Sequence, residues 1–148
     1  MKPAMLLVTL GLAVLIGGCD RYRVTLNERV ISEPPVLLGS VRTADQALQA
    51  CIDQTIADRG IRTLEDFNTL ICTHAGIQSV EGLQALGRLS TLNLAENALT
   101  AVAPLLFLGE LTAVNLAGNP DLDCQEVKKL AAQLPTSGAL VAPEHCRD

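Results

Sequence analysis

Five cysteines and two histidines are the residues of this 148-residue chain best suited to covalent or metal chemistry. The cysteines are Cys19, Cys51, Cys72, Cys124 and Cys146. The sequence places His74 two residues after Cys72 and His145 directly before Cys146. Two sulfurs and two imidazoles would suit zinc, whereas cysteines in an oxidising compartment form disulfides. The choice depends on the compartment and on the elements that bring these residues together.

The remaining residue types give no arrangement typical of catalysis. The carboxylates are spread over different segments, as on a solvated surface, and no nucleophile stands beside a base. Gly17-Gly18 belong to the N-terminal leader, and the other glycines form no phosphate-binding loop. The net charge of -5 argues against a nucleic-acid partner, because phosphate binding needs a clustered cationic surface. We therefore expect no enzymatic activity and no nucleic-acid binding.

The first 18 residues are typical of an export signal. Lys2 gives a positive start, and an apolar run extends from Met5 to Ile16. This run is shorter than the roughly 20 residues that cross a bilayer, which favours a cleavable signal. The sequence Ile16-Gly17-Gly18-Cys19 resembles the lipobox of bacterial lipoproteins. The resemblance implies cleavage before Cys19, with diacylglyceryl and N-acyl lipid on that cysteine as the membrane anchor.

The residues after Cys19 bear on localisation. In enterobacterial lipoproteins, an Asp at this place resembles the signal for retention in the inner membrane. Asp20 therefore favours the periplasmic face of the inner membrane, and the outer membrane stays open. Residues 19–42 have no helical periodicity and contain two adjacent prolines, which predicts a lipidated flexible tether. Tyr22, Val24 and Leu26 alternate with polar residues, so a short strand is the alternative.

Apolar residues recur with a spacing of 22 positions in the second half of the chain. Segments aligned from Phe67, Leu89 and Leu111 share columns in which every residue is apolar. The columns are Phe67/Leu89/Leu111, Leu70/Leu92/Val114, Cys72/Leu94/Leu116, Val80/Val102/Cys124, Leu83/Leu105/Val127 and Leu86/Leu108/Leu130. Such agreement does not arise by chance in a chain that is 49% apolar. A period of this length indicates a solenoid of stacked coils.

The middle segment, LSTLNLAENALTAVAPLLFLGE, resembles the 22-residue leucine-rich repeat of internalin-like bacterial proteins, LxxLxLxxNxLxxLxxLxxLxx. Leu92 and Leu94 fit a short strand with both side chains inward, and Asn97 fits an inward turn whose backbone groups its amide satisfies. The resemblance implies an α/β solenoid of about three coils over residues 61–122. It also implies binding rather than catalysis, by analogy of fold.

Helical caps are expected at both ends of the coils. Thr43 and Gln46 resemble a capping box, which predicts a cap helix over residues 43–60. Asp123 and Glu126 resemble a second capping box, so residues 123–148 should form the C-terminal cap. Leu140-Val141 leaves room there for a final short strand. The leucine-rich-repeat domain then spans residues 43–148.

The stacking of coils selects the disulfide pairing. Cys72 lies in the first coil and Cys124 at the end of the third. Coils about 4.8 Å apart place these sulfurs roughly 10 Å or more from each other, beyond disulfide reach. With Cys19 lipidated, the sequence predicts the pairs Cys51–Cys72 and Cys124–Cys146. The same separation puts the two cysteine–histidine pairs at opposite ends, which argues against a metal site.

Outward positions of the strands line the concave face, where solenoids usually bind. The candidate partner-binding residues are Thr69, Ile71, Thr91, Asn93 and Asn115. Threonine and small residues also suit a crowded sheet, so a purely structural surface stays open.

The sequence predicts a membrane-anchored protein-interaction module, with a protein of the cell envelope as partner and no cofactor beyond the lipid on Cys19. One alternative is a structural envelope lipoprotein without a discrete ligand. The other is a thiol redox or metal-handling lipoprotein.

Overall fold

The computed structural model describes residues 24–26, 29–32, 41–135 and 139–147. The chain divides into two compact units, Met1–Pro34 and Pro35–Asp148. The expected signal peptide, Cys19 and Asp20 lie outside the described residues. In the first unit, β1 (Val24–Leu26) and β2 (Arg29–Ser32) pair as an antiparallel hairpin. The alternation of Tyr22, Val24 and Leu26 with polar residues indicates β1, the alternative to a flexible tether. The sequence does not predict β2.

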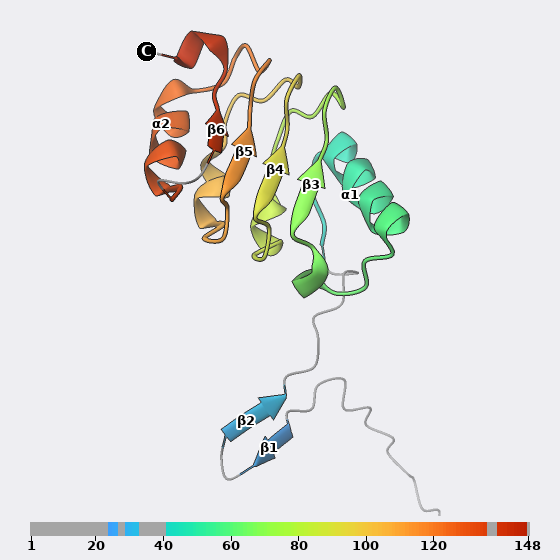
Figure 1. Cartoon of the computed structure of the whole chain (residues 1–148). Coiled ribbons are helices and arrows are strands. Elements are labelled where there is room, and N and C mark those ends of the chain that lie inside the picture. Colours follow the sequence, from blue (N-terminus) through green and yellow to red (C-terminus); the bar gives the residue numbers. More distant parts are fainter. Residues whose placement is uncertain (1–23, 27–28, 33–40, 136–138, 148) are drawn as a thin grey trace, which may run out of the picture. The chain divides into compact units, whose positions relative to one another are not determined.

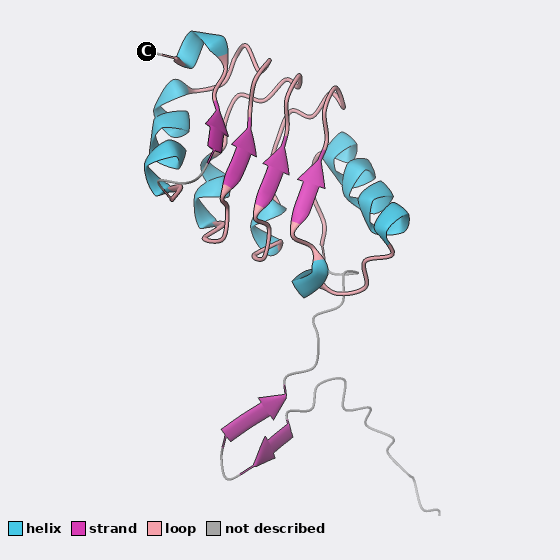
Figure 2. Ribbon diagram, viewed as in Figure 1, coloured by secondary structure: helices cyan, strands magenta, loops and turns pink. Residues whose placement is uncertain are grey.

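The second unit is a solenoid with a parallel four-stranded sheet along one side (Figures 1 and 2). The strands lie side by side in chain order, as β3 (Thr69–Ile71), β4 (Thr91–Asn93), β5 (Ala113–Asn115) and β6 (Ala139–Val141). Among the described residues, short 3-10 helices complete the turns: η2 (Leu64–Asp66), η3 (Leu83–Ala85), η4 (Ala103–Phe107) and η5 (Glu144–Cys146).

Two α-helices stand at the ends of the stack. Helix α1 (Gln46–Arg59) packs against β3, and Figure 1 shows it beside that strand. Helix α2 (Cys124–Gln133) packs against η4, so it replaces the 3-10 helix of the third coil. The fourth strand makes the stack one strand longer than the three aligned coils.

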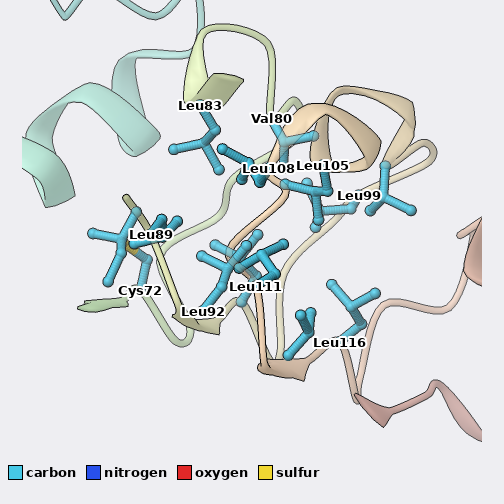
Figure 3. Close-up of a cluster of buried hydrophobic side chains, with 14 of the residues drawn as sticks. Cys72, Val80, Leu83, Leu89, Leu92, Leu99, Leu105, Leu108, Leu111 and Leu116 are labelled. Carbon is cyan, nitrogen blue, oxygen red and sulfur yellow. The ribbon is translucent and has the colours of Figure 1, made fainter. Parts of the chain in front are cut away.

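The six repeating columns form the core, as the 22-residue period predicts. Every member is buried except Cys124, which is half-buried, and Figure 3 shows a cluster of these side chains converging inside the coils. Ile77 and Leu99 add a further buried column. Burying one such side chain contributes about 1.5–3 kcal/mol. Because one coil cannot cover its own inner face, this contribution depends on stacking.

Asn97 and Asn119 are the buried polar residues of the described core. Asn97 Oδ1 accepts hydrogen bonds from the backbone N–H groups of Ala75 (3.1 Å) and Ile77 (3.0 Å). Its Nδ2 donates to three backbone carbonyls, those of Cys72 (2.8 Å), Leu94 (2.9 Å) and Ala95 (3.2 Å). Asn119 makes four of the five equivalent bonds one coil later, with its Oδ1 accepting from the Leu99 N–H (3.1 Å). These amides join neighbouring coils where the strands have ended.

The first cap helix begins later than the sequence predicts. Its N-cap is Asp45, whose Oδ1 accepts from the Leu48 N–H (3.0 Å), and not Thr43. The Thr43 hydroxyl donates instead to the Asp45 carbonyl (3.0 Å). The other oxygen of the Asp45 carboxylate accepts from the N–H groups of Gln78 (2.8 Å) and Ser79 (3.0 Å). One carboxylate therefore caps α1 and ties it to the first coil, which a local capping motif cannot reveal.

These contacts set the charge state of Asp45. Burial by itself would raise the pKa of this carboxyl, but hydrogen bonds from the backbone of Leu48, Gln78, Ser79 and Ala47 outweigh it and lower the pKa below its usual range. The carboxylate is therefore held in its charged form, the form that accepts all of these bonds.

The second capping box is only half correct. Asp123 is the N-cap of α2, and its side chain accepts from a backbone N–H of the first turn (2.7 Å). Glu126 does not reach back, because the Asp123 N–H donates to the Thr100 carbonyl (3.0 Å). The Glu126 carboxylate accepts instead from the N–H groups of Val102 (2.6 Å) and Ala103 (2.8 Å). It thereby fixes α2 to the preceding coil.

The two disulfides are the pairs expected from the stacking of coils. Cys51 is bonded to Cys72 with a Cα–Cα distance of 6.0 Å. Cys124 is bonded to Cys146 with a Cα–Cα distance of 5.1 Å. The first bond joins α1 to the residue that follows β3, and the second joins the start of α2 to η5.

Candidate functional site

The outward side chains of the four strands form one continuous surface, which we call the sheet face. Alternation along each strand turns the middle residue into the core and the first and third residues outward. The register aligns them in two rows: Thr69, Thr91, Ala113 and Ala139, then Ile71, Asn93, Asn115 and Val141. All eight side chains are half-buried or exposed, and none is charged.

Two asparagine amides give the sheet face its hydrogen-bonding capacity. Asn93 Oδ1 accepts from the Ala95 N–H (3.1 Å), and Asn115 Oδ1 accepts from the Ala117 N–H (3.0 Å). These bonds fix the orientation of both side chains. Their Nδ2 groups have no hydrogen-bond acceptor within the described part of the chain. Because neighbouring strands lie about 4.8 Å apart, the amides offer two adjacent donors.

Aliphatic side chains flank these donors at each end of the row. Ile71 is 53% exposed and Val141 is 41% exposed. Three strand spacings of about 4.8 Å put the two residues roughly 14 Å apart. Across the sheet, the row therefore has an apolar side chain at each end and two amide donors between them. Such a row can bind an uncharged protein surface that supplies acceptors between two apolar contacts.

The structure brings together all five residues that the sequence singled out, namely Thr69, Ile71, Thr91, Asn93 and Asn115. The sequence reasoning missed Val141 as a member. From Asn115 to its β6 partner the spacing is 26 residues, not 22, because α2 lies between them. A fixed period therefore cannot place Val141 in the row, although the expected strand at Leu140-Val141 was a partial signal.

A second surface lies at the corner where the strands end. His74, Glu96 and Gly118 occupy equivalent places and all have left-handed backbone, with φ of 54°, 57° and 69°. A Cβ at Gly118 would overlap the Glu96 carboxyl group, which lies over this glycine. Glu96 and Gly118 line a shallow hollow at this corner, together with Glu144 and Arg147. It mixes both signs of charge and has no single chemical preference.

His145 lies beside the second disulfide. A ring nitrogen of His145 and the Sγ atoms of Cys124 and Cys146 are all within 4.8 Å of one another. His145 Nε2 lies 2.9 Å from the Leu122 carbonyl, which can only accept, so this nitrogen carries the proton. Because each sulfur is bonded to the other, neither is a thiolate that could bind a metal. Cys72 is likewise bonded to Cys51.

The returning side of the coils carries one large exposed apolar residue. Phe107 is 77% exposed and borders a shallow hollow lined by Glu81, Gln84, Ala103 and Pro104. Among the described residues, no helix has the length and apolar character required to cross a bilayer.

Comparison with known proteins supports the fold. The sequence matches no protein-family model and no curated protein. An internalin from Listeria monocytogenes superimposes with a TM-score of 0.54 and 23% identity, over 72% of this chain and 32% of that chain. The INT-containing part of Clostridium perfringens ZmpB gives a TM-score of 0.42 and 23% identity, over 58% of this chain and 20% of that chain.

This chain spans about a third of the internalin chain, so the likeness does not extend to the whole of that protein. The parallel strands, buried leucine columns and inward asparagines are the features that the repeat predicted. The second unit of the chain is therefore a small leucine-rich-repeat solenoid with a helix at each end.

Proposed function

We propose that the chain is a membrane-anchored protein-interaction module of the bacterial cell envelope, which binds a partner protein through the sheet face. The observation that carries the proposal is the row Ile71, Asn93, Asn115 and Val141, which holds two oriented donors between two exposed aliphatic side chains. Both amides reach solvent, so a partner that offers acceptors can replace the water molecules that solvate them.

The charge distribution supports a protein partner. The chain has a net charge of -5, yet no residue of the sheet face is charged. Partner surfaces that are neutral and offer acceptors can approach here without desolvating a charge. The absence of tryptophan, and of any aromatic residue on the sheet face, predicts a modest affinity, since aromatic anchors dominate tight interfaces.

Anchoring is proposed from the sequence. Cys19 follows a short apolar run and stands where the lipobox of bacterial lipoproteins has its cysteine. Several acyl chains on that residue would hold the chain stably at a membrane, whereas one chain gives only marginal binding. Two disulfides are consistent with export, because such bonds persist in oxidising compartments. Non-enzymatic action is part of the same proposal.

Photocrosslinking in cells tests the proposal. A photoreactive residue at Thr91, in the middle of the sheet face, should give one discrete crosslinked protein. The matched position is Gln84, which is exposed on the returning side. We expect Thr91→Arg to remove the crosslink formed from Ala113, a neighbour in the same row, while Gln84→Arg leaves it unchanged.

The outcomes separate the candidate functions. Diffuse products from both positions would support a structural envelope lipoprotein and contradict the module. A discrete partner captured from Gln84 but not from Thr91 would exclude the sheet face as the binding surface. Titration of the exported chain for free thiols addresses the thiol-based alternative, since intact disulfides leave no reactive thiol at Cys51, Cys72, Cys124 or Cys146.

A further inference from the structure

The parallel sheet has two edges, β3 and β6, which differ in what lies beside them. Inner strands use both of their sides for pairing, but β3 and β6 each have one side without a neighbouring strand. An edge strand presents unpaired N–H and C=O groups that another chain can use. Folded proteins usually cover such an edge or occupy its polar groups.

At the first edge a helix lies beside the strand, and one outward carbonyl has a hydrogen-bond partner. Helix α1 packs against β3, and the disulfide between Cys51 and Cys72 holds it there. The Arg59 guanidinium donates to the Thr69 carbonyl at the start of the strand (3.4 Å). Helix α1, held by this disulfide, therefore shields the β3 edge.

At the second edge no partner among the described residues occupies the outward polar groups. The Ala139 N–H donates to the Thr112 carbonyl (3.0 Å), and the Val141 carbonyl accepts from the Leu116 N–H (2.8 Å). Alternation in a parallel ladder then turns the N–H and C=O of Leu140 and the N–H of Ala142 away from β5. No described residue bonds to these three groups. Helix α2 packs mainly against η4 and η5, so it does not shield this edge as α1 shields the other.

The core is also incomplete at this edge. The inner row of the sheet is buried at Leu70, Leu92 and Val114, which are 0%, 1% and 2% exposed. Leu140, the β6 member of the row, is only half-buried. One more apolar side chain beside Leu140 would continue the row and remove the remaining apolar surface from water.

We propose that the β6 edge binds an extended segment of a partner protein as a fifth, parallel strand, with an apolar residue beside Leu140. The outward groups along the edge alternate as N–H, C=O and N–H. An extended peptide backbone offers acceptors and donors in the complementary order, as in the binding of a peptide strand to a sheet edge. A parallel segment uses all three groups. An antiparallel segment pairs with the N–H and C=O of the same residue, and at Ala142 the carbonyl already accepts from the Arg147 Nε (3.0 Å). This site uses backbone groups of β6, whereas the sheet face uses the outward side chains of the strands, Ala139 and Val141 of β6 among them.

Hydrogen exchange and peptide titration of the 15N-labelled chain test the proposal. In the free chain, the amides of Leu140 and Ala142 should exchange much faster than those of Ala139 and Val141. The probe is a capped synthetic peptide with the sequence of residues 111–117, which pairs next to β6 in the native sheet. On titration, the Leu140 and Ala142 amide signals should shift and their exchange should slow. The same peptide with N-methylated backbone at alternate residues should have no effect.

Two variants make the test specific. Ala142→Pro removes one free N–H but no bond to β5, so the fold should persist by circular dichroism. The loss of one hydrogen bond should lower the affinity of the chain for the peptide about five- to tenfold. Thr91→Arg, on the sheet face, should leave this binding unchanged.

Any of the following results would overturn the proposal. One is slow exchange of the Leu140 and Ala142 amides in the free chain, which would mean that the edge is already covered. Another is a peptide response confined to the sheet face, or absent at millimolar peptide. The last is concentration-dependent protection of the same amides without peptide, which would make a second copy of the chain the occupant.

Discussion

Replacing Asn97 with alanine tests whether a buried amide holds two coils together. The Asn97 side chain makes five hydrogen bonds, all to backbone groups. Alanine keeps the backbone conformation accessible but removes every one of these bonds. We expect a large loss of stability with no change in the apolar columns of the core.

The magnitude follows from which groups keep a partner. The Leu94 carbonyl still accepts from Asn119, and the Ala95 carbonyl still accepts from the His74 N–H. The buried Ile77 N–H and the Cys72 carbonyl lose the side-chain partner that holds them. A buried polar group without a partner costs about 1–3 kcal/mol, so two such groups predict a loss of about 2–6 kcal/mol. That is a large share of the roughly 5–15 kcal/mol typical of a folded domain.

Urea unfolding followed by far-ultraviolet circular dichroism measures this loss, because the chain has no tryptophan and one tyrosine. The midpoint should fall with little change in the slope. The matched control is Asn68→Ala, an exposed asparagine whose Oδ1 accepts only from the Thr69 hydroxyl. The control should change stability by less than about 0.5 kcal/mol. If Asn97→Ala behaves like the control, the amide does not join the coils and the reasoning is wrong.

Three further predictions address the caps and the anchor. Gly82→Ala should lower stability by about 1–3 kcal/mol in urea unfolding, because φ is 100° and a Cβ would lie 2.6 Å from the Arg42 carbonyl; Gly87→Ala, with open space around its Cβ, should not. The pKa of Asp45 is lowered by folding, so its stabilising effect should be present above the unfolded pKa and be lost as pH falls through the folded value. Asp45→Asn should flatten that acidic part of the stability profile, and an unchanged profile would contradict the assigned role. Mass spectrometry of the exported chain should find a lipidated N-terminal peptide beginning at Cys19, and Cys19→Ser should release the protein from membranes.

The sequence was sufficient to predict the coil region because its signal is repeated. Each inner column contains several equivalent residues, so Leu94 and Leu116 support the same assignment in a way that a single strand cannot. Asn97 was predictable for the same reason, since its polar side chain recurs at a fixed place in an apolar period. The disulfides followed once the coils had an order in space.

What the sequence could not predict depends on contacts between distant residues. Asp45 replaces Thr43 as the helix cap because its carboxylate also binds Gln78 and Ser79, more than thirty positions away. Glu126 looks like a local capping residue but binds Val102 and Ala103 of the coil before it. Val141 joins the sheet face only after α2 has broken the period. In each case the deciding contact or element is far along the sequence from the residues that make up the local motif.

The position of the two disulfides has a consequence for how the molecule comes apart. Terminal coils have one neighbour instead of two, so a stack of this kind tends to fray from its ends. Here each terminal coil is covalently linked to its cap, across sequence separations of 21 and 22 residues. A loop of that size contributes about 3 kcal/mol in the chain-entropy model. The oxidised chain should therefore melt in a single cooperative transition, while the reduced chain should peel open progressively from both ends.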